Sequence, residues 1–501
     1  MSTLEILVFL PLLAALAVGL GAPARFTSVA TAGLVLLIGV YCAVNFQTSV
    51  EGGGSVQFAS SRDLLEMPGF PKLSLAFGLD GISLVLVMLT ALVLVAAVLV
   101  APEESAIGGS AKLYYLSLLL IGGGALGAFT ATDLFFLYAF HELALIPTFL
   151  MIGIFGQGEN RVRTAWTITI FLGVGSLILL VGLLLAVGAL GGTTFDLATL
   201  TALAKSPGIA PGAQSAIFLL LFIGFGILVS LFPFHSWAAP AYAEAPAPVT
   251  MLHAGVLKKF GLYGLIRIAL PLAPAGAEKW MPLVLVLLLG NILFIGFVTI
   301  AQKKLDRMLG YSSVMHMGYA FLGIAAGNVV GVSGTVLLLF AHGISIALLF
   351  ALAGWMRDRF GTLEFEKFGG LAKSLPKLGL LFGFAAFASI GLPGFANFVA
   401  EIEIFFGAFS GGDVGMTWIR WATVGALWGV VISAVYMLRA YRGIFMGPKS
   451  ETITLPADLS WKLRFPMLLL LIALLAVGFA PDLLNQFIRP AVNGLLPLSA
   501  G

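Results

Sequence analysis

Long apolar stretches recur along the chain, and each is close to the length of a helix that crosses a membrane. A transmembrane helix needs about 20 predominantly apolar residues. Fourteen such runs can be traced, with short polar connections between most of them. They begin near Leu4, Ser28, Gly81, Leu113, Asp133, Ala165, Ala216, Val249, Met281, Met308, Val332, Leu378, Thr417 and Phe465. The pattern predicts an all-α polytopic membrane protein with about fourteen transmembrane helices.

The composition excludes most classes of soluble protein. Of the 501 residues, 60% are hydrophobic and 10% are charged, whereas soluble domains have about 45–50% apolar and about 25% charged residues. A soluble enzyme, a nucleic-acid-binding protein and a disordered scaffold are therefore poor interpretations. The single cysteine, Cys42, cannot form a disulfide within the chain or hold an iron–sulfur cluster.

Basic residues are distributed unevenly between the connections. Seventeen Lys and Arg side chains lie in connections that follow odd-numbered runs, and four lie in connections that follow even-numbered runs. Cytoplasmic loops carry the excess of Lys and Arg in membrane proteins. We therefore expect the odd-numbered connections to face the cytoplasm and both termini to lie on the outer side.

Two of the runs contain residues that break helices. The seventh run enters the segment Leu231–Pro240, and the twelfth contains Gly391-Leu-Pro-Gly394. Proline removes a backbone donor and glycine loosens the backbone. In a bilayer such breaks are tolerated only where protein or water satisfies the freed polar groups.

The positions of the two breaks favour an internal repeat. Each break occupies the fourth place in a group of five spans, and a unit with an odd number of spans re-enters the membrane from the opposite side. The predicted units are residues 1–112 (helices 1–3), 113–273 (first five-helix repeat), 274–445 (second, inverted repeat) and 446–501 (last helix and tail). Two unrelated kinks at matching places are the alternative.

One acid lies in the middle of an apolar run. Glu142 follows His141 in the fifth run and precedes Pro147 by five residues. A charge at the centre of a bilayer costs about 2.5–3.5 kcal/mol on insertion scales, so such residues usually have a partner or a function. Glu142 is a candidate proton-relay acid, with a permanently paired structural carboxylate as the alternative.

The eighth run contains two adjacent lysines, Lys258 and Lys259. Neighbouring residues of an α-helix point about 100° apart. We therefore expect one lysine to face the interior and the other to snorkel or to contact a neighbouring helix. A buried lysine can switch between its neutral and charged forms, so one of the two is a candidate relay residue.

Other polar side chains lie in or beside the later runs. Glu401 and Glu403 follow the second break and point to nearly opposite sides of a helix, so one of them is expected to face the interior. His316 and His342, in adjacent runs, are candidates either for proton transfer near pH 7 or for polar contacts between helices. Arg267 lies near the outer end of its run and is expected to snorkel to the interface.

Several chemistries have no sequence support. No two histidines have the spacing of a helical zinc site and no His-Glu-x-x-His motif occurs, so we predict no metal site. No phosphate-binding glycine loop opens a helix, so nucleotide chemistry is not predicted in this chain.

A set of motifs carries a family resemblance over roughly residues 80–445. The motifs are His141-Glu-Leu-Ala-Leu-Ile-Pro-Thr-Phe-Leu150, Phe234-His-Ser-Trp237, Ala245-Pro-Ala-Pro-Val249, Ala254-Gly-Val-Leu-Lys-Lys259, Tyr263-Gly-Leu-Ile-Arg-Ile268, Tyr311-Ser-Ser-Val-Met-His-Met-Gly318, Ala341-His-Gly343, and Gly391-Leu-Pro-Gly394 through Asn397-Phe-Val-Ala-Glu401. Together they resemble the antiporter-like subunits of respiratory complex I, and among these the M, or chain 4, group.

The resemblance implies fourteen helices with inverted repeats and a role in moving protons while other subunits reduce quinone. It implies that Glu142 is the acid of the fifth helix and Lys259 the central lysine of the eighth. Glu401 matches the acid that the M group carries in the twelfth helix, where related subunits carry lysine. His316 and His342 match polar residues of the central axis.

The same resemblance implies where the chain works and with what. It implies a multi-pass protein of the bacterial inner (plasma) membrane, which makes the outer side the periplasm. Its partners would be other hydrophobic membrane-arm subunits and membrane lipid, with no nucleic acid. The chain itself would carry no cofactor, and FMN, iron–sulfur clusters and quinone would be bound by partner subunits.

The sequence also departs from the family pattern. Where the family usually has a lysine seven residues before the His-x-Trp motif, this chain has Leu228. The extra lysine, Lys258, is a candidate substitute from another helix. Two alternatives therefore stay open: a cation/proton antiporter or membrane-bound hydrogenase-type subunit, and a structural subunit of a divergent complex that has lost pumping.

Overall fold

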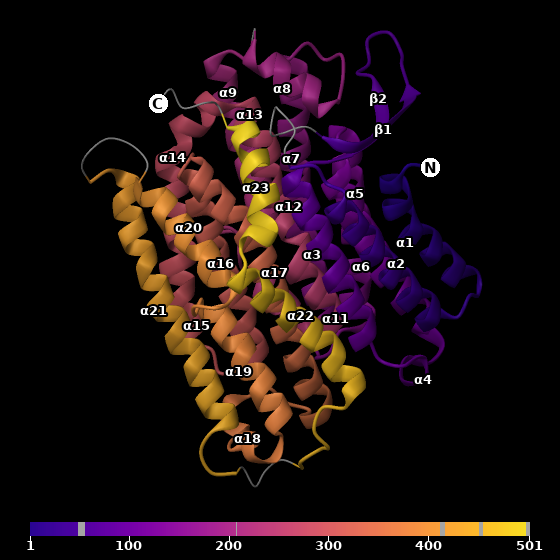
Figure 1. Cartoon of the computed structure of the whole chain (residues 1–501), viewed down its shortest axis with the longest axis vertical. Coiled ribbons are helices and arrows are strands. Elements are labelled where there is room, and N and C mark those ends of the chain that lie inside the picture. Colours follow the sequence, from indigo (N-terminus) through magenta and orange to yellow (C-terminus); the bar gives the residue numbers. More distant parts are fainter. Residues whose placement is uncertain (49–55, 207, 411–415, 450–453, 497–501) are drawn as a thin grey trace.

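Long helices form the body of the chain, because a segment inside a bilayer must satisfy its backbone hydrogen bonds within itself. The computed structural model describes residues 1–48, 56–206, 208–410, 416–449 and 454–496. Parts of the predicted connections and of the predicted C-terminal unit, including its last residues, lie outside the described residues. Most of the helices run along the long axis of the molecule (Figure 1).

Eleven helices of the described residues are long and apolar enough to cross a membrane. They are α1 (Thr3–Leu20), α2 (Ala24–Val44), α3 (Gly81–Val100), α5 (Ala111–Thr130), α6 (Leu134–Phe155), α7 (Arg161–Ala189), α9 (Pro211–Val229), the continuous run α14–α15 (Pro274–Ile300), α17 (Val329–Phe360), α21 (Trp418–Phe445) and α22 (Trp461–Phe479). The prediction of a polytopic helical membrane protein is thus confirmed.

The other three predicted spans are helical too, but each departs from a long apolar helix. The eighth is assembled from α11 (Ala247–Leu252), α12 (Lys259–Gly264) and α13 (Leu270–Leu272), joined by the π-helical turns His253–Leu257 and Leu265–Ala269. The tenth, α16 (Leu305–Ala325), is long but rich in polar residues. The twelfth is divided into α19 (Pro376–Ile390) and α20 (Ala396–Ser410).

Both predicted breaks are present. Helix α9 ends at Val229, Ser230 adopts a left-handed conformation (φ +66°), and the chain becomes helical again in α10 (Ala238–Glu244). Helix α19 ends at Ile390, and the next residue, Gly391, has φ +81°, a conformation that L-residues with a Cβ avoid. In both places helix continues beyond the break, as the positions of proline and glycine indicate.

The ends of the bundle carry smaller elements, and one of them is a β-hairpin that was not predicted from the sequence. Strands β1 (Gln57–Leu65) and β2 (Leu73–Leu79) pair antiparallel within the connection that precedes α3. They lie at the same end as the N-terminus and α8 (Leu197–Lys205), whereas α4 (Glu104–Ile107) and α18 (Leu371–Ser374) lie at the opposite end (Figure 1). The last helix, α23 (Asp482–Leu495), packs on α3 and α17.

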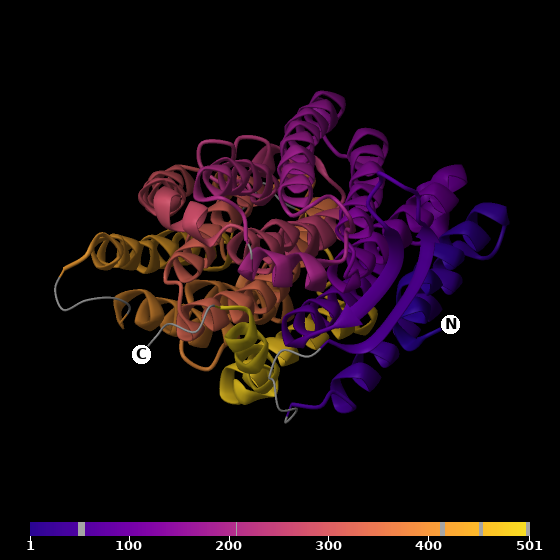
Figure 2. The same ribbon diagram turned by 90° about the horizontal axis from the view of Figure 1, so that it is seen from above.

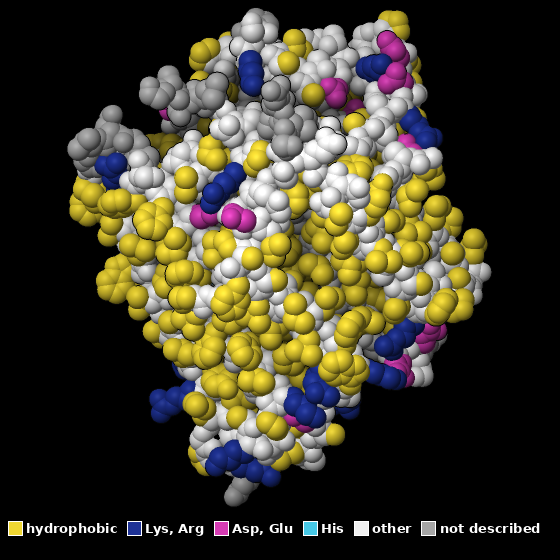
Figure 3. Space-filling view, in the orientation of Figure 1, with side chains coloured by type: hydrophobic (Ala, Val, Ile, Leu, Met, Phe, Trp, Pro, Cys, Tyr) yellow, Lys and Arg dark blue, Asp and Glu magenta, His cyan; other side chains and the backbone are white. Residues whose placement is uncertain are grey.

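Helix α17 is the axis around which the others pack. Its most apolar stretch is entirely buried in the protein, and it contacts α3, α16, α20 and α22. Seen from above, the N-terminal helices α1 and α2 lie at one edge and α21 at the opposite edge (Figure 2). On the face seen in Figure 3, hydrophobic side chains cover most of the middle and most charged side chains lie toward the two ends, as expected for a protein surrounded by lipid.

A buried line of ionisable and polar side chains

Glu142 lies on α6, at one end of a line of polar groups. Its carboxylate accepts a hydrogen bond from the hydroxyl of Ser176 on α7 and lies 3.3 Å from Nδ1 of His141. The side chain is 35% exposed and borders a small cavity of about 150 Å³ between α6 and α7. The ring of His141 is buried and stacks on Phe260 at 3.9 Å, which joins α6 to the eighth span.

Both lysines of the eighth span are buried, and Lys258 contacts a neighbouring helix, which is one of the two arrangements expected for the second lysine. Lys258 is 1% exposed and Lys259 is 0% exposed. The Lys258 ammonium donates to the Ser313 hydroxyl at 3.3 Å and lies 5.7 Å from the centre of the Tyr242 ring. The two side chains contact different helices, Lys258 α16 and Lys259 α17, as the angle of about 100° between neighbouring helical residues predicts.

Lys259 connects the eighth span to the two histidines. Its ammonium lies 2.8 Å from Nδ1 of His342 on α17 and donates to the carbonyl of Ala254 at 3.0 Å. The rings of His342 and His316 are 5.5 Å apart. His316 on α16 lies 3.0 Å from the carbonyl of Ser389, at the end of α19. Four of the six candidate residues are therefore brought together around the axis of the bundle. They are Lys258, Lys259, His316 and His342.

Glu401 lies beyond this group, on α20 just after the break. Its side chain is buried, and the Cβ of any residue replacing Gly391 would meet its carboxylate at 2.5 Å. The ring of Tyr319 lies 5.8 Å from that of His316 and 5.5 Å from that of Phe405 on α20. Glu401 therefore occupies the interior position beside the backbone that the break leaves open.

Glu403 points elsewhere, as its spacing from Glu401 indicates. Its carboxylate accepts from the Asn485 amide at 2.8 Å and from the Arg489 guanidinium at 2.9 Å. Both partners lie on α23. Glu403 thus attaches the C-terminal helix to α20, and Glu401 is the acid that faces the interior.

Leu228 is buried beside the extra lysine. Leu228, Lys258, His141 and His253 border the same narrow gap between α6, α9 and the eighth span. The ring of His253 lies 3.3 Å from the hydroxyl of Tyr242. The Lys258 ammonium therefore comes from the eighth span into the neighbourhood where the family pattern has a lysine on the seventh.

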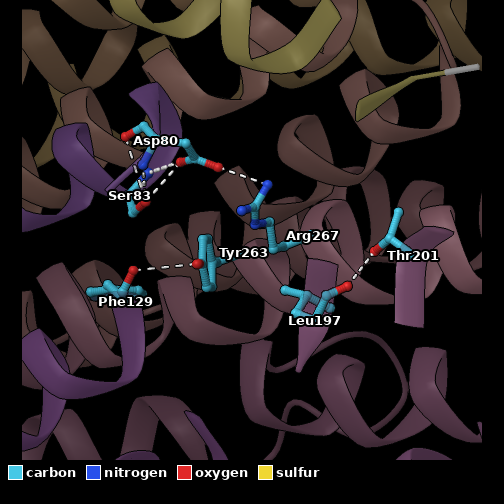
Figure 4. A network of polar contacts seen from close by, with 7 residues as sticks. All are labelled: Asp80, Ser83, Phe129, Leu197, Thr201, Tyr263 and Arg267. Carbon is cyan, nitrogen blue, oxygen red and sulfur yellow. Dashed lines mark hydrogen bonds and ion pairs between the residues drawn. The ribbon is translucent and has the colours of Figure 1, made fainter. Parts of the chain in front are cut away.

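A buried ion pair was missed by sequence reasoning, and it corrects the expectation for Arg267. The Arg267 guanidinium lies 2.8 Å from the Asp80 carboxylate, and their side chains are 13% and 1% exposed. Asp80 also accepts from the backbone and hydroxyl of Ser83 at the start of α3 (Figure 4). Nearby, the Tyr263 hydroxyl donates to the carbonyl of Phe129 at 3.3 Å (Figure 4). The opposite charge of Asp80, just before an apolar run, was the signal available in the sequence.

Apolar helices, two of them interrupted, surround a line of ionisable side chains that runs from α6 to α20. Groups of this kind are rare inside membrane proteins and mark ion or proton pathways. Interrupted helices near such groups are typical of secondary transporters. Fold and site together place the chain in the class of antiporter-like polytopic membrane proteins.

Comparisons with known proteins agree with this class. The family model described as NADH:quinone oxidoreductase/Mrp antiporter, transmembrane, matches residues 131–433, more than half of the chain. An NAD(P)H-quinone oxidoreductase chain 4 of Microcystis aeruginosa is 38% identical over 76% of this chain and 67% of its own length. NADH-quinone oxidoreductase subunit M of Rhodobacter capsulatus is 31% identical over 98% of this chain and 96% of its own.

Solved structures show the same fold. A chain of respiratory complex I from Thermus thermophilus superposes with a TM-score of 0.86 at 33% identity and covers 99% of this chain and 100% of its own. A chain of the Mrp complex from Dietzia superposes with a TM-score of 0.84 at 22% identity over 100% of this chain and 98% of its own, which shows the fold alone. The chain belongs to the family of antiporter-like membrane subunits of NAD(P)H:quinone oxidoreductases, in the group called subunit M or chain 4.

Proposed function

We propose that this membrane-arm subunit translocates protons, and that quinone reduction in other subunits of the same complex drives the transfer. The observation that carries the proposal is the line of ionisable side chains that extends from Glu142 to Glu401 through the buried lysines and histidines. A pathway for protons needs groups that bind and release them at short intervals. The helices that surround the line are predominantly apolar, so protons are confined to the line.

Each candidate residue has a place in this pathway. Glu142 is the entry acid, because its side chain is the most exposed of the set and borders a cavity. Lys259 is the central carrier and exchanges its proton with His342. His316 continues the line toward Glu401, the terminal acid of this chain.

Lys258 takes the role of the lysine that Leu228 replaces. It borders the gap that also reaches His141, so its charge acts on the His141–Glu142 end of the line. The proposal predicts that Lys258→Met slows pumping and that Leu228→Lys, introduced into the Lys258→Met variant, restores part of it.

Electrostatic coupling supplies the driving force between neighbouring sites. Lys259 and His342 are 2.8 Å apart. Two positive charges at that distance repel each other by about 6 kcal/mol at an effective dielectric constant near 20. A proton that arrives on one group therefore favours release from the other, so a charge change at one end of the line can be passed to the next site.

The membrane topology that goes with this function has fourteen spans. In it the eighth, tenth and twelfth segments cross the membrane in addition to the eleven long helices. Residues 113–273 and 274–445 form two inverted repeats, flanked by residues 1–112 and 446–501. The preponderance of Lys and Arg in the odd-numbered connections supports a cytoplasmic location for these connections. Both termini then lie on the periplasmic side of a bacterial inner membrane.

The redox chemistry belongs to partner subunits. The chain has one thiol, Cys42, which is buried among apolar residues, and one thiol cannot hold an iron–sulfur cluster. Iron–sulfur clusters, FMN and quinone are assigned to other subunits of the complex. Other hydrophobic membrane-arm subunits and lipid cover its apolar flanks. A solved relative is described as respiratory complex I with bound NADH, which supports NAD(P)H as the source of electrons.

The test is Glu142→Gln, a change that keeps the shape of the side chain and removes its charge. The complex is purified through a tag on this chain, and proton uptake driven by quinone reduction is followed with a pH-sensitive dye in vesicles. We expect normal assembly and a large loss of pumping, because the first proton-binding group is gone. The exposed Glu159→Gln serves as the control and is expected to pump normally. Undiminished pumping by Glu142→Gln would refute the assignment of Glu142.

One observation favours a second candidate function, a structural subunit that no longer pumps. Leu228 stands where the family pattern has a lysine, so the first half of the line has one positive charge fewer than that pattern. The double variant Glu142→Gln, Lys259→Met separates the two: unchanged protons per electron would favour the structural subunit, whereas a reduced ratio supports translocation.

A further inference from the structure

Both ring nitrogens of His316 face carbonyl oxygens. Nδ1 lies 2.8 Å from the carbonyl of Ser312, one turn earlier on α16, and Nε2 lies 3.0 Å from the carbonyl of Ser389 on α19. The side chain is 1% exposed. These two distances are those of good hydrogen bonds, and both partners can only accept.

A neutral imidazole cannot make both hydrogen bonds. It has one N–H group, and its second nitrogen carries a lone pair. In the neutral ring, one of the two contacts would set that lone pair against the lone pairs of a carbonyl oxygen. The imidazolium ion carries two N–H groups, so the observed contacts are the full set of hydrogen bonds of charged His316.

The break in the twelfth span explains why the Ser389 carbonyl is available. At the end of α19, the N–H of Gly391 donates to the carbonyl of Ala388 at 3.1 Å, and the N–H of Leu392 donates to that of Phe387 at 3.1 Å. These two hydrogen bonds use the carbonyls of Ala388 and Phe387. They leave the carbonyl of Ser389 to accept from His316. The C-terminal end of a helix also favours a positive charge, so a charged His316 is a well-suited partner.

Groups from every neighbouring element act on His316. Lys259 of the eighth span contacts His342 of α17, whose ring lies 5.5 Å from that of His316. Lys258 is hydrogen-bonded to Ser313, which lies on the same helix as His316. Their positive charges oppose a charge on His316. Three further titratable groups face this region: Glu401 of α20, Tyr319 of α16, and Tyr436 of α21, which is hydrogen-bonded to Ser312.

We propose that His316 is a proton-dependent latch between α16 and the broken twelfth span. With its proton, His316 holds the end of α19 through Ser389. When the proton moves on, one of the two hydrogen bonds is lost, and the bond to Ser389 is the one whose partner lies on another helix. The segment beside Glu401 is then free to shift. The inference rests on the proposed function, and it adds that proton transfer through His316 opens the way to Glu401.

The test places a nitroxide spin label in the break. Leu392 is 39% exposed and lies within the break, and Cys42 is the only native cysteine. In a Cys42→Ser background, Leu392→Cys is labelled in the purified complex, the signal of the equally treated Cys42→Ser complex is subtracted to remove labelled cysteines of other subunits, and the mobility of the label is followed against pH. A label at Leu380→Cys, 62% exposed on α19 and away from the break, is the matched control.

The latch predicts that the mobile fraction at position 392 rises with pH along a one-proton curve, while the control label does not change. In His316→Gln, which cannot carry the charge, the label is expected to be mobile at every pH. A flat profile in the labelled chain that retains His316 would overturn the latch, and this measurement needs no variant of His316. The same pH dependence in His316→Gln would overturn it as well.

The outcome is separate from that of the proposed function. Loss of pumping in Glu142→Gln together with a flat label profile leaves proton translocation in place and rejects the latch. A one-proton profile that His316→Gln abolishes, with undiminished pumping in Glu142→Gln, supports the proton dependence of the break and rejects the pathway through Glu142.

Discussion

The ion pair between Arg267 and Asp80 gives a prediction about stability. It joins the eighth span to the start of α3, at a place where both side chains are almost fully buried. The perturbation is Arg267→Gln, which removes the positive charge and leaves the carboxylate. Asp80 would keep its bonds to Ser83, but the oxygen that faces Arg267 would lose its charged partner.

The magnitude follows from the 2.8 Å separation. At an effective dielectric constant near 20, the attraction is about 6 kcal/mol, and the cost of removing both ions from water offsets much of it. Removing one partner of a buried pair costs about 3–5 kcal/mol, since an unpaired charge stays behind. At about 1.36 kcal/mol for each factor of ten, this is a change of two to four orders of magnitude in a folding equilibrium.

The assay is the amount of tagged chain in the membrane and the thermal midpoint of the purified complex. Arg267→Gln should lower both, and the double variant Asp80→Asn, Arg267→Gln should recover much of the loss because no charge remains unpaired. If Arg267→Gln matched the native sequence in both measurements, or if the double variant were as unstable as the sum of the single changes, the reasoning would be refuted.

Three further predictions concern close contacts of the site. Gly391→Ala should reduce pumping more than assembly, because the new Cβ would lie 2.5 Å from the Glu401 carboxylate and φ is +81°; proton uptake per assembled complex measures this. Gly343→Ala should separate α17 from the eighth span, because its Cβ would lie 2.6 Å from the carbonyl of Gly255, and should lower both pumping and the thermal midpoint. Lys258→Arg should pump more slowly than the native sequence, because a larger cation must fit a fully buried site; a native rate would count against a steric limit.

Much of the fold could be predicted from the sequence, because each long run of apolar residues is visible locally. The same holds for the two breaks, where proline and glycine cannot continue a helix. The β-hairpin was not predicted, because the connection that contains it, residues 47–80, is rich in Gly and Ser. The strand Leu73–Leu79 does alternate in part between apolar and small residues, which is the signal that was available.

The candidate site was predicted in its residue types but not in its contacts. Helical spacing predicts that Glu401 and Glu403 point to nearly opposite sides, but only the packing of α20 decides that Glu401 is the buried acid. The contact between Lys259 and His342 joins residues 83 positions apart, and only packing of the helices can supply it. The burial of both lysines could not be predicted from the sequence, because it depends on α16 and α17, which pack against the eighth span and contact Lys258 and Lys259.

The measurement that tests the account most directly is the number of protons moved per electron by a Lys259→Met variant in reconstituted vesicles. Lys259 is the fully buried centre of the line, and its ammonium group contacts His342 directly. Lys205→Met, at an exposed lysine of α8, is the control. The account predicts an assembled complex with a reduced ratio of protons to electrons and a control that matches the native complex. An unchanged ratio in Lys259→Met would contradict proton transfer through this line.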